Sequence, residues 1–153
     1  MALNVSTLRS RIQRVFEDNL PDKAQIARRI ARAYQEYARA AQAPPGVPVV
    51  LKGTEVRVLE NGILTFLNAR MPAPQAAQII GSAITAFWLL PPVQTGAGGV
   101  VTAIVTQAGV AKLISTRVKT VPAAALALSS SLDLMTRTVF VVNPPPVSPG
   151  FIF

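Results

Sequence analysis

The chain contains no cysteine and no histidine. It therefore has no disulfide, no thiolate nucleophile and no imidazole base, and it lacks the two side chains that bind most transition metals. Charged residues are also scarce, at 14% of the chain against about 25% in typical soluble domains. Because half of the residues are apolar, the charged side chains are too few to cover a free surface. This composition suggests burial in an assembly or in a membrane.

Patterns that carry catalysis are missing as well. The serine run 129–131 has no histidine or lysine beside it, and the glycine-rich stretch 95–99 is not followed by the Gly-Lys-Ser/Thr of a phosphate-binding loop. Six of the seven acids lie in the first 60 residues. Helix ends and polar faces explain them better than paired acids for acid–base chemistry or Mg²⁺ binding. We expect no enzyme activity, no catalytic residue, no metal site and no cofactor.

Proline, in contrast, is frequent and regularly placed. An apolar residue precedes Pro21, Pro72 and Pro122, which are 51 and 50 residues apart, and a proline cluster follows each of them at 44–48, 91–92 and 144–149. An Ala-rich segment with the hydrophobic spacing of a helix lies between each of these three prolines and the proline cluster that follows it. A period of about 50 residues indicates a repeat architecture. The pattern predicts a mainly α fold within one domain, 1–153, built of three helix–proline elbow–helix units at about 1–52, 53–106 and 107–143.

Hydrophobic spacing places the helices inside these units. Leu8, Ile12 and Val15 share one face, Ser6 is a candidate first cap, and Asp22 begins the next helix. Further helices are expected at 61–69, from Pro74 to before Pro91, at 108–117 and at 123–135. Short β-like linkers follow, as a hairpin at 47–59 and as β-branched stretches at 98–106 and 136–143. These linkers are expected to pair as a small sheet or to serve as arms.

The first unit is strongly basic. Residues 1–52 hold nine Lys and Arg against four Asp and Glu, a net charge of +5. Arg28, Arg32 and Arg39 fall on one stripe opposite the apolar face and are predicted to contact a partner. Nucleic acid, an acidic neighbour and solvent all suit such a stripe, but no aromatic residue lies between these arginines to stack on bases. Nucleic acid is therefore an alternative partner and not the favoured one.

The middle of the chain carries no charge at all. The 41 residues from Met71 to Ala111 contain no Asp, Glu, Lys or Arg. If three hairpins pack side by side, the middle one is shielded by the outer two and by neighbouring subunits, where a charge would be costly to desolvate. Phe87 and Trp88 in this stretch are predicted partner contacts. Gln78, Ser82 and Thr85 interrupt the segment 76–93, so a membrane span is not expected.

The last ten residues, 144–153, are predicted to form an extended arm. Pro144, Pro145, Pro146 and Pro149 favour an extended backbone. Three apolar residues end the chain and find little burial within a domain of their own. Phe151, Ile152 and Phe153 are therefore predicted to dock on a neighbouring subunit.

A family resemblance joins these features. The opening "MALNVSTLRSRIQRVFED", the segments "AQIARRIARAYQEYARAA" and "TAFWLLPPV", and the late "AAALALSSSLDLMTRTVFVVNPPPVSPG" resemble small virion structural proteins of tailed bacteriophages. The resemblance implies a non-enzymatic subunit of a symmetric particle, of the neck or tail connector type, assembled in the host cytoplasm. Its partners would be other copies of itself and other virion proteins. The alternatives are a small basic DNA-associated protein and a membrane-active or pore protein.

Overall fold

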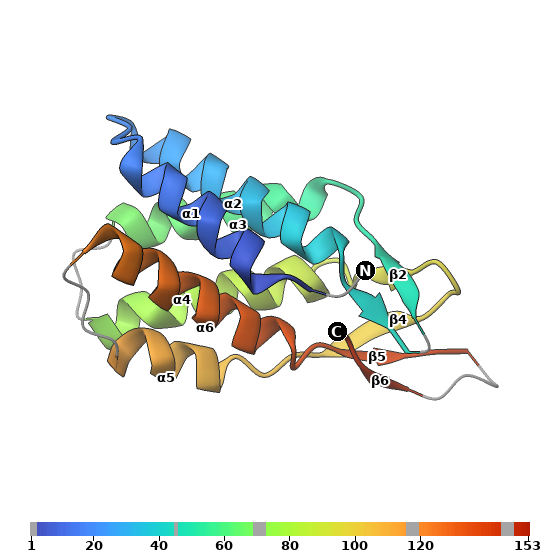
Figure 1. The fold of residues 1–153 in the computed structure, drawn as a ribbon. Coiled ribbons are helices and arrows are strands. Elements are labelled where there is room, and N and C mark those ends of the chain that lie inside the picture. The colour runs from blue at the N-terminus through green and yellow to red at the C-terminus, as the bar shows by residue number, and fades with distance from the viewer. Residues whose placement is uncertain (1–2, 45, 69–72, 116–119, 145–148) are drawn as a thin grey trace.

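The computed structural model describes residues 3–44, 46–68, 73–115, 120–144 and 149–153, and these form six helices and six short strands (Figure 1). Pro72, Pro45 and Pro145–146, with the predicted helix ends at 69 and 117, lie outside the described residues. The fold is mainly helical with short strands, as the sequence predicts. The helices are α1 (Val5–Glu17), α2 (Lys23–Arg39), α3 (Thr54–Asn68), α4 (Ala73–Leu89), α5 (Gln107–Ser115) and α6 (Val121–Thr136).

Two short strands follow each successive pair of helices. They are β1 (Gln42–Ala43), β2 (Val47–Val50), β3 (Gln94–Thr95), β4 (Val100–Ala103), β5 (Phe140–Val142) and β6 (Gly150–Phe151). The strands lie in the order β1-β2-β3-β4-β5-β6, and every neighbouring pair is antiparallel. The predicted linkers therefore pair as a small sheet, which covers one end of the helical bundle (Figure 1).

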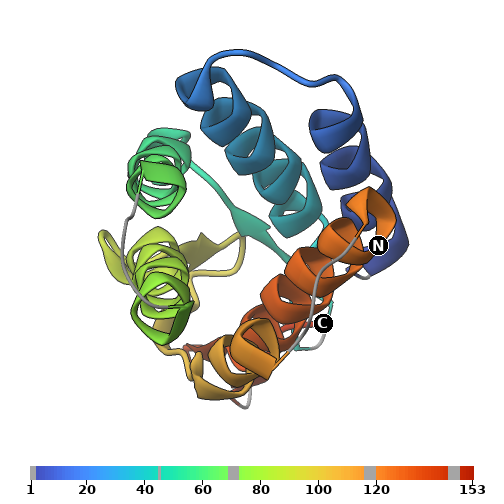
Figure 2. The same ribbon diagram turned by 90° about the vertical axis from the view of Figure 1, so that its left-hand side faces the viewer.

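The six helices surround a common core. Each helix packs on the next one along the chain, and α1 also packs on α6, so the last hairpin returns to the first. Figure 2, which looks along the bundle, shows the three hairpins around this core. The expectation of three hairpins side by side is wrong, because the α1–α6 contact leaves no hairpin in a middle position. The uncharged helix α4 therefore keeps an outward face, with Gln75, Gln78 and Ser82 exposed.

Polar caps start several of the helices. The Asn4 side chain accepts a hydrogen bond from the Thr7 amide at 3.1 Å and caps α1, so the expectation of Ser6 at this position is wrong. Asp22 caps α2, as predicted, through a 2.9 Å bond from the Ala24 amide. Pro21 lies in the α1–α2 connection. Pro122 lies in the first turn of α6, where its missing N–H has no helical partner to lose.

The hairpin expected at 47–59 is also wrong beyond Val50. Gly53, at φ 95°, turns the chain, and α3 begins at Thr54. The buried carboxylate of Glu55 reaches back and accepts hydrogen bonds from the amides of Lys52 and Gly53 at 3.0 and 2.8 Å. These bonds satisfy the two amides just before the helix and hold a carboxylate in its first turn, which stabilises a helix where the alternating sequence favours a strand.

The end of the chain does not form a free arm. Residues 150–151 form β6 on the edge of β5, and the Ile152 amide donates to the Val139 carbonyl. The prolines prevent pairing only where they stand, and residues 150–153 contain none. Ile152 is 3% exposed in the chain's own core.

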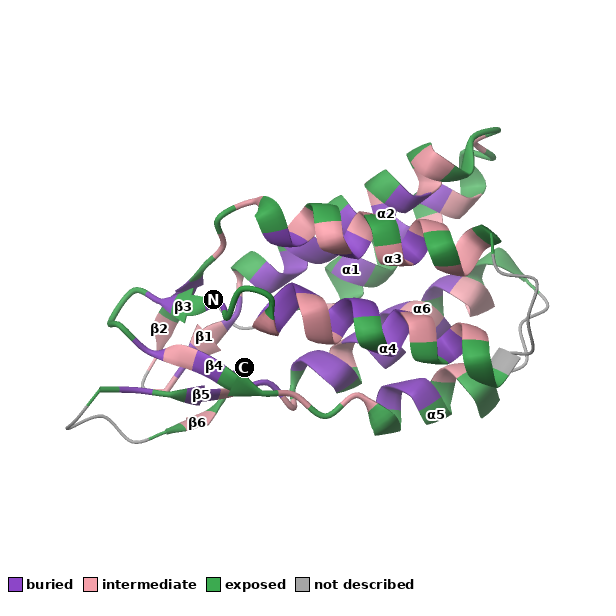
Figure 3. Cartoon of the chain, turned by 180° about the vertical axis from the view of Figure 1, so that it is seen from behind, coloured by how far each residue is buried: buried purple, intermediate pink, exposed green. Residues whose placement is uncertain are grey.

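Figure 3 shows buried residues along the inward faces of the helices and of the strands. An aromatic group lies at the centre of this core. Tyr34 meets Phe87 edge-on with ring centroids 5.1 Å apart, and Phe87 meets Trp88 at 5.4 Å. All three side chains are fully buried.

Candidate functional site

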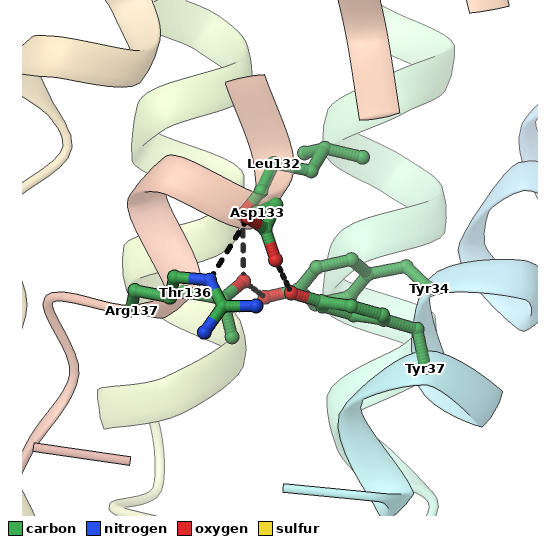
Figure 4. Close-up of polar contacts among 6 residues, drawn as sticks. All are labelled: Tyr34, Tyr37, Leu132, Asp133, Thr136 and Arg137. Atoms are coloured by element: carbon green, nitrogen blue, oxygen red, sulfur yellow. Dashed lines mark hydrogen bonds and ion pairs between the residues drawn. The ribbon is translucent and has the colours of Figure 1, made fainter. Parts of the chain in front are cut away.

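A chain of hydrogen bonds links α2, α4 and α6 inside the core. The Trp88 Nε1–H donates to the Tyr34 hydroxyl at 2.9 Å, and the Tyr34 and Thr136 hydroxyls lie 2.6 Å apart. Thr136 donates its only hydroxyl hydrogen to the Leu132 carbonyl at 2.7 Å. Tyr34 must therefore be the donor to Thr136 (Figure 4). Every buried side-chain nitrogen and oxygen in this hydrogen-bonded series has a hydrogen-bond partner, and so do the other such atoms of the described residues.

A second link lies one helical turn away and leads to the surface. The Tyr37 hydroxyl donates to Asp133 Oδ1 at 2.5 Å, and Arg137 Nε donates to Asp133 Oδ2 at 2.9 Å (Figure 4). Tyr37 is buried, the Asp133 side chain is 16% exposed, and Arg137 is exposed. Two hydrogen bonds thus join α2 to α6. The bond between Tyr34 and Thr136 is neutral, and the bond from Tyr37 to Asp133 is charge-assisted.

Both tyrosines are held in their protonated form. Burial raises the pKa of Tyr34, and the hydrogen bonds that its hydroxyl makes with Thr136 and Trp88 offset only part of this effect. Burial also raises the pKa of Tyr37, and the hydrogen bond to Asp133 raises it further. The same carboxylate raises the pKa of Arg137. Protonated tyrosines act as hydrogen-bond donors and not as bases, so this arrangement fixes helices against one another.

The three arginines predicted as partner contacts are all exposed on α2. Arg28 lies 3.4 Å from Glu60 of α3, and Arg39 lies 2.7 Å from Glu36 on its own helix. Exposed ion pairs of this kind contribute at most about 1 kcal/mol to stability. Arg32 has no such carboxylate among the described residues. Gln35, which the periodicity places on the same stripe, is buried.

Arg32 instead belongs to a groove along the outer side of the α1–α2 hairpin. A hollow of about 320 Å³ in this groove is lined by Arg11, Arg14, Arg29 and Arg32, with Val15, Ala33 and Glu36. Arg11, Arg14 and Arg29 contribute to the positive charge of residues 1–52, but the pattern of the sequence does not single them out as partner contacts. A helical wheel of each segment, with the two drawn antiparallel, is the signal that brings these four arginines together.

The apolar residues predicted to bind partners divide into a buried set and an exposed set. Phe87, Trp88 and Ile152 lie in the chain's own core, so their assignment to a partner surface is corrected. They belong to the hydrophobic core that the helices and the sheet enclose. Phe151 and Phe153, in contrast, are 58% and 40% exposed. The Phe151 ring lies edge-on to Phe140 of β5, with centroids 5.2 Å apart.

Exposed apolar side chains and charges occupy different parts of the surface. Ten large apolar residues are exposed among the described residues, and none of them lies in α1, α2 or α3. Those three helices hold thirteen charged residues, whereas α4, α5 and α6 hold only Lys112 and Asp133. The exposed apolar set is Val50, Leu90, Val105, Ile114, Val121, Leu126, Leu134, Val142, Phe151 and Phe153.

The serine run 129–131 and the glycine-rich stretch 95–99 make hydrogen bonds within the chain's own helices and strands. In the serine run, Ser129 and Ser131 donate to carbonyls of their own helix at 3.3 and 2.7 Å. In the glycine-rich stretch, the Thr95 hydroxyl accepts a hydrogen bond from the Gly99 amide at 2.9 Å between β3 and β4. No group of three potential metal ligands occurs among the described residues. Within the same residues, no helix combines the length and the apolar character needed to cross a bilayer.

Comparison of the chain with protein-family models, with curated proteins and with solved structures found no match in any of the three.

Proposed function

We propose that the chain is a non-enzymatic structural subunit of a large symmetric assembly, and that this assembly is a tailed-phage virion component of the neck or tail connector type. The observation that carries the proposal is the division of the surface. Exposed large apolar side chains occur only outside α1–α3, on segments that are nearly free of charge. Exposed apolar side chains that gather on nearly uncharged segments suit surfaces that partners cover.

The energetics favour a partner on the apolar side. An exposed Phe or Leu gains on the order of 1.5–3 kcal/mol when it is fully buried. Leu126 and Leu134 are two helical turns apart on α6, and Phe151 lies on the outer face of β5 and β6. Contacts at these separate places suit a subunit with several neighbours. The absence of charge on α4 and its near absence on α5 and α6 lowers the cost of removing these surfaces from water.

The order of elements supports the three predicted units. Residues 1–52 contain α1, α2, β1 and β2, residues 53–106 contain α3, α4, β3 and β4, and residues 107–143 contain α5, α6 and β5. We take these units as diverged copies of one helix–elbow–helix element. In this proposal only some copies kept surface charges, because the others came to face neighbouring subunits.

In this proposal a partner covers the last strand, β6. Residues 150–153 do not serve as a free arm in this proposal, since the buried Ile152 side chain anchors them to the chain's own sheet. Phe151 and Phe153 then act as fixed apolar contacts on the outside of that sheet. A fixed contact loses less conformational entropy on binding than a free arm does.

The native mass in solution tests the proposal. Sedimentation velocity should give a species of several 16.2 kDa subunits, and Phe151→Asp and Leu134→Glu should each shift it toward the single subunit. Thr65→Asp, an exposed change on α3, introduces the same charge and should leave the mass unchanged. A wild-type chain that stays a single subunit at every concentration, and that also fails to enter particles in an infected host, would overturn the proposal.

A further inference from the structure

Three neighbouring hollows follow the outer side of the α1–α2 hairpin, and we treat them as one groove because they share lining residues. The second and third share residues with the arginine-lined hollow, including Arg11 in both cases. Together they extend over residues 4–15 of α1 and its cap and over residues 29–40 of α2 and its cap. Eleven residue steps at 1.5 Å correspond to a groove of about 16 Å. We call this feature the arginine groove.

The positive charge of the arginine groove is largely uncompensated. The four ion pairs of the described residues involve Arg28, Arg29, Arg39 and Arg137. Arg11, Arg14 and Arg32 therefore have no carboxylate partner within that part of the chain. The groove also contains Glu36, but Arg39 occupies this carboxylate at 2.7 Å. Several like charges along one groove repel each other, so a bound anion would relieve an unfavourable arrangement in the free chain.

We infer that the arginine groove binds the sugar–phosphate backbone of a nucleic-acid strand without reading its bases. The groove supplies side chains that contact phosphate oxygens. The three guanidinium groups without a carboxylate partner, those of Arg11, Arg14 and Arg32, present planar forks that match phosphate geometry. Three hydroxyl residues, Ser6, Thr7 and Ser10, line its end beside Arg11 and Arg14, and hydroxyls are common phosphate donors.

An acidic protein segment fits the same surface less well. Protein interfaces are organised around buried apolar or aromatic anchors. None of the exposed large apolar side chains of the described residues lies on α1, α2 or α3. The tyrosine that reaches the groove, Tyr37, is buried and its hydroxyl is bound to Asp133. The surface thus offers charge and hydroxyl groups but no anchor, which favours a backbone of regularly spaced phosphates.

The inference is independent of the assembly role, because the arginine groove and the exposed apolar set lie on different elements. A subunit that failed to oligomerise would still carry the groove. The two proposals therefore fail in different experiments. Loss of assembly in the Phe151→Asp variant should leave nucleic-acid binding to one subunit in place.

Binding to oligonucleotides of arbitrary sequence tests the inference. The groove variant is Arg11→Gln/Arg14→Gln/Arg32→Gln, and the control is Lys52→Gln/Arg57→Gln/Lys112→Gln. Each variant removes three positive charges, and all six side chains are exposed, so both should keep the circular dichroism of the parent chain. Fluorescence anisotropy with single-stranded and duplex DNA, over a series of salt concentrations, gives the affinity and its salt dependence.

We expect the groove variant to lose at least tenfold in affinity at low salt and the control to lose less than threefold. The slope of log affinity against log salt is negative, and its magnitude should be smaller by about 2–3 in the groove variant, since each phosphate contact contributes about 0.7–0.9 to that magnitude. Equal losses in both variants would mean that net charge alone drives binding and would overturn the inference. Absence of DNA binding at low salt would also overturn it, as would groove-dependent binding of polyglutamate that exceeds binding of DNA.

Discussion

Gln42 and Phe153 exchange two backbone hydrogen bonds, from the Gln42 amide to the Phe153 carbonyl at 2.9 Å and from the Phe153 amide to the Gln42 carbonyl at 3.0 Å. Gln42 belongs to β1, the first strand of the sheet, and Phe153 follows β6, the last. This pair therefore returns the strand order to its start. The helices also close on themselves, since the last helix, α6, packs against the first, α1. Closure of a sheet removes edges that would otherwise pair with other chains.

The first prediction concerns the residue that holds this closure in place. Ile152→Ala removes a buried side chain next to the Gln42–Phe153 pair. Loss of a buried aliphatic side chain costs about 2–5 kcal/mol, and urea unfolding followed by Trp88 fluorescence should show a loss in this range. Trp88 is the single tryptophan and is fully buried, so its emission reports the whole core.

Phe153→Ala is the matched control, since Phe153 is 40% exposed and binds β1 through backbone atoms. A change of this kind should cost less than about 1 kcal/mol. Equal losses for the two variants would contradict the placement of residue 152 inside the sheet.

The second prediction uses the fact that the chain has only two tyrosines, Tyr34 and Tyr37. Both are buried and both have a raised pKa. Absorbance of the folded chain in the near ultraviolet should therefore show no tyrosinate as the pH passes 10.0, the ordinary value. The urea-unfolded chain should titrate both tyrosines near that pH. A folded chain that titrates one tyrosine near pH 10.0 would contradict the burial of that hydroxyl.

The third prediction follows from linkage between protonation and folding. A pKa that folding raises gives stability that is fully present below the unfolded pKa of 10.0 and is lost as the pH rises above it. With two such groups the free energy of unfolding should fall by up to about 2.7 kcal/mol per pH unit. Denaturant titrations at a series of alkaline pH values measure this slope.

The double variant Tyr34→Phe/Tyr37→Phe provides the control for the alkaline slope. It should be less stable at neutral pH, because the Trp88 Nε1–H loses its acceptor and Asp133 loses one donor. Its stability should then change little between neutral pH and the region above pH 10.0. An unchanged alkaline slope in this variant would assign the slope to other groups.

The sequence predicted most helices because their signals are local. Leu8, Ile12 and Val15 repeat at helical spacing, and Asp22 starts α2 through a bond to a residue two positions away. The start of α3, residues 54–60, was missed for the opposite reason. Residues 47–59 alternate like a strand, and the reach of Glu55 back to Lys52 and Gly53 overrides that alternation.

The buried hydrogen bonds and the candidate binding surfaces were harder to predict because they depend on contacts between distant segments. Tyr37 meets Asp133 across 96 residues and Tyr34 meets Thr136 across 102, which no spacing rule connects. The burial of Phe87 and Trp88 likewise depends on how the hairpins surround the core. Exposure of Arg28, Arg32 and Arg39 follows from the polar face of one helix. The arginine groove required the neighbouring helix as well.

The last prediction concerns the close approach of α5 and α6. A Cβ atom at Gly109 would lie 2.6 Å from the Ser131 carbonyl oxygen and 2.5 Å from Met135 Cγ. Ala favours a helix over Gly by about 1 kcal/mol, but overpacking typically costs about 1–3 kcal/mol. Since a backbone oxygen is in the way, we expect Gly109→Ala to lower the free energy of unfolding by on the order of 1 kcal/mol. Gly96→Ala is the matched control, because its Cβ would have no neighbour closer than 3.8 Å and should change stability by less than about 1 kcal/mol. A Gly109→Ala chain that gains the full helix preference would mean that α5 and α6 are farther apart than their contact at Ser131 requires.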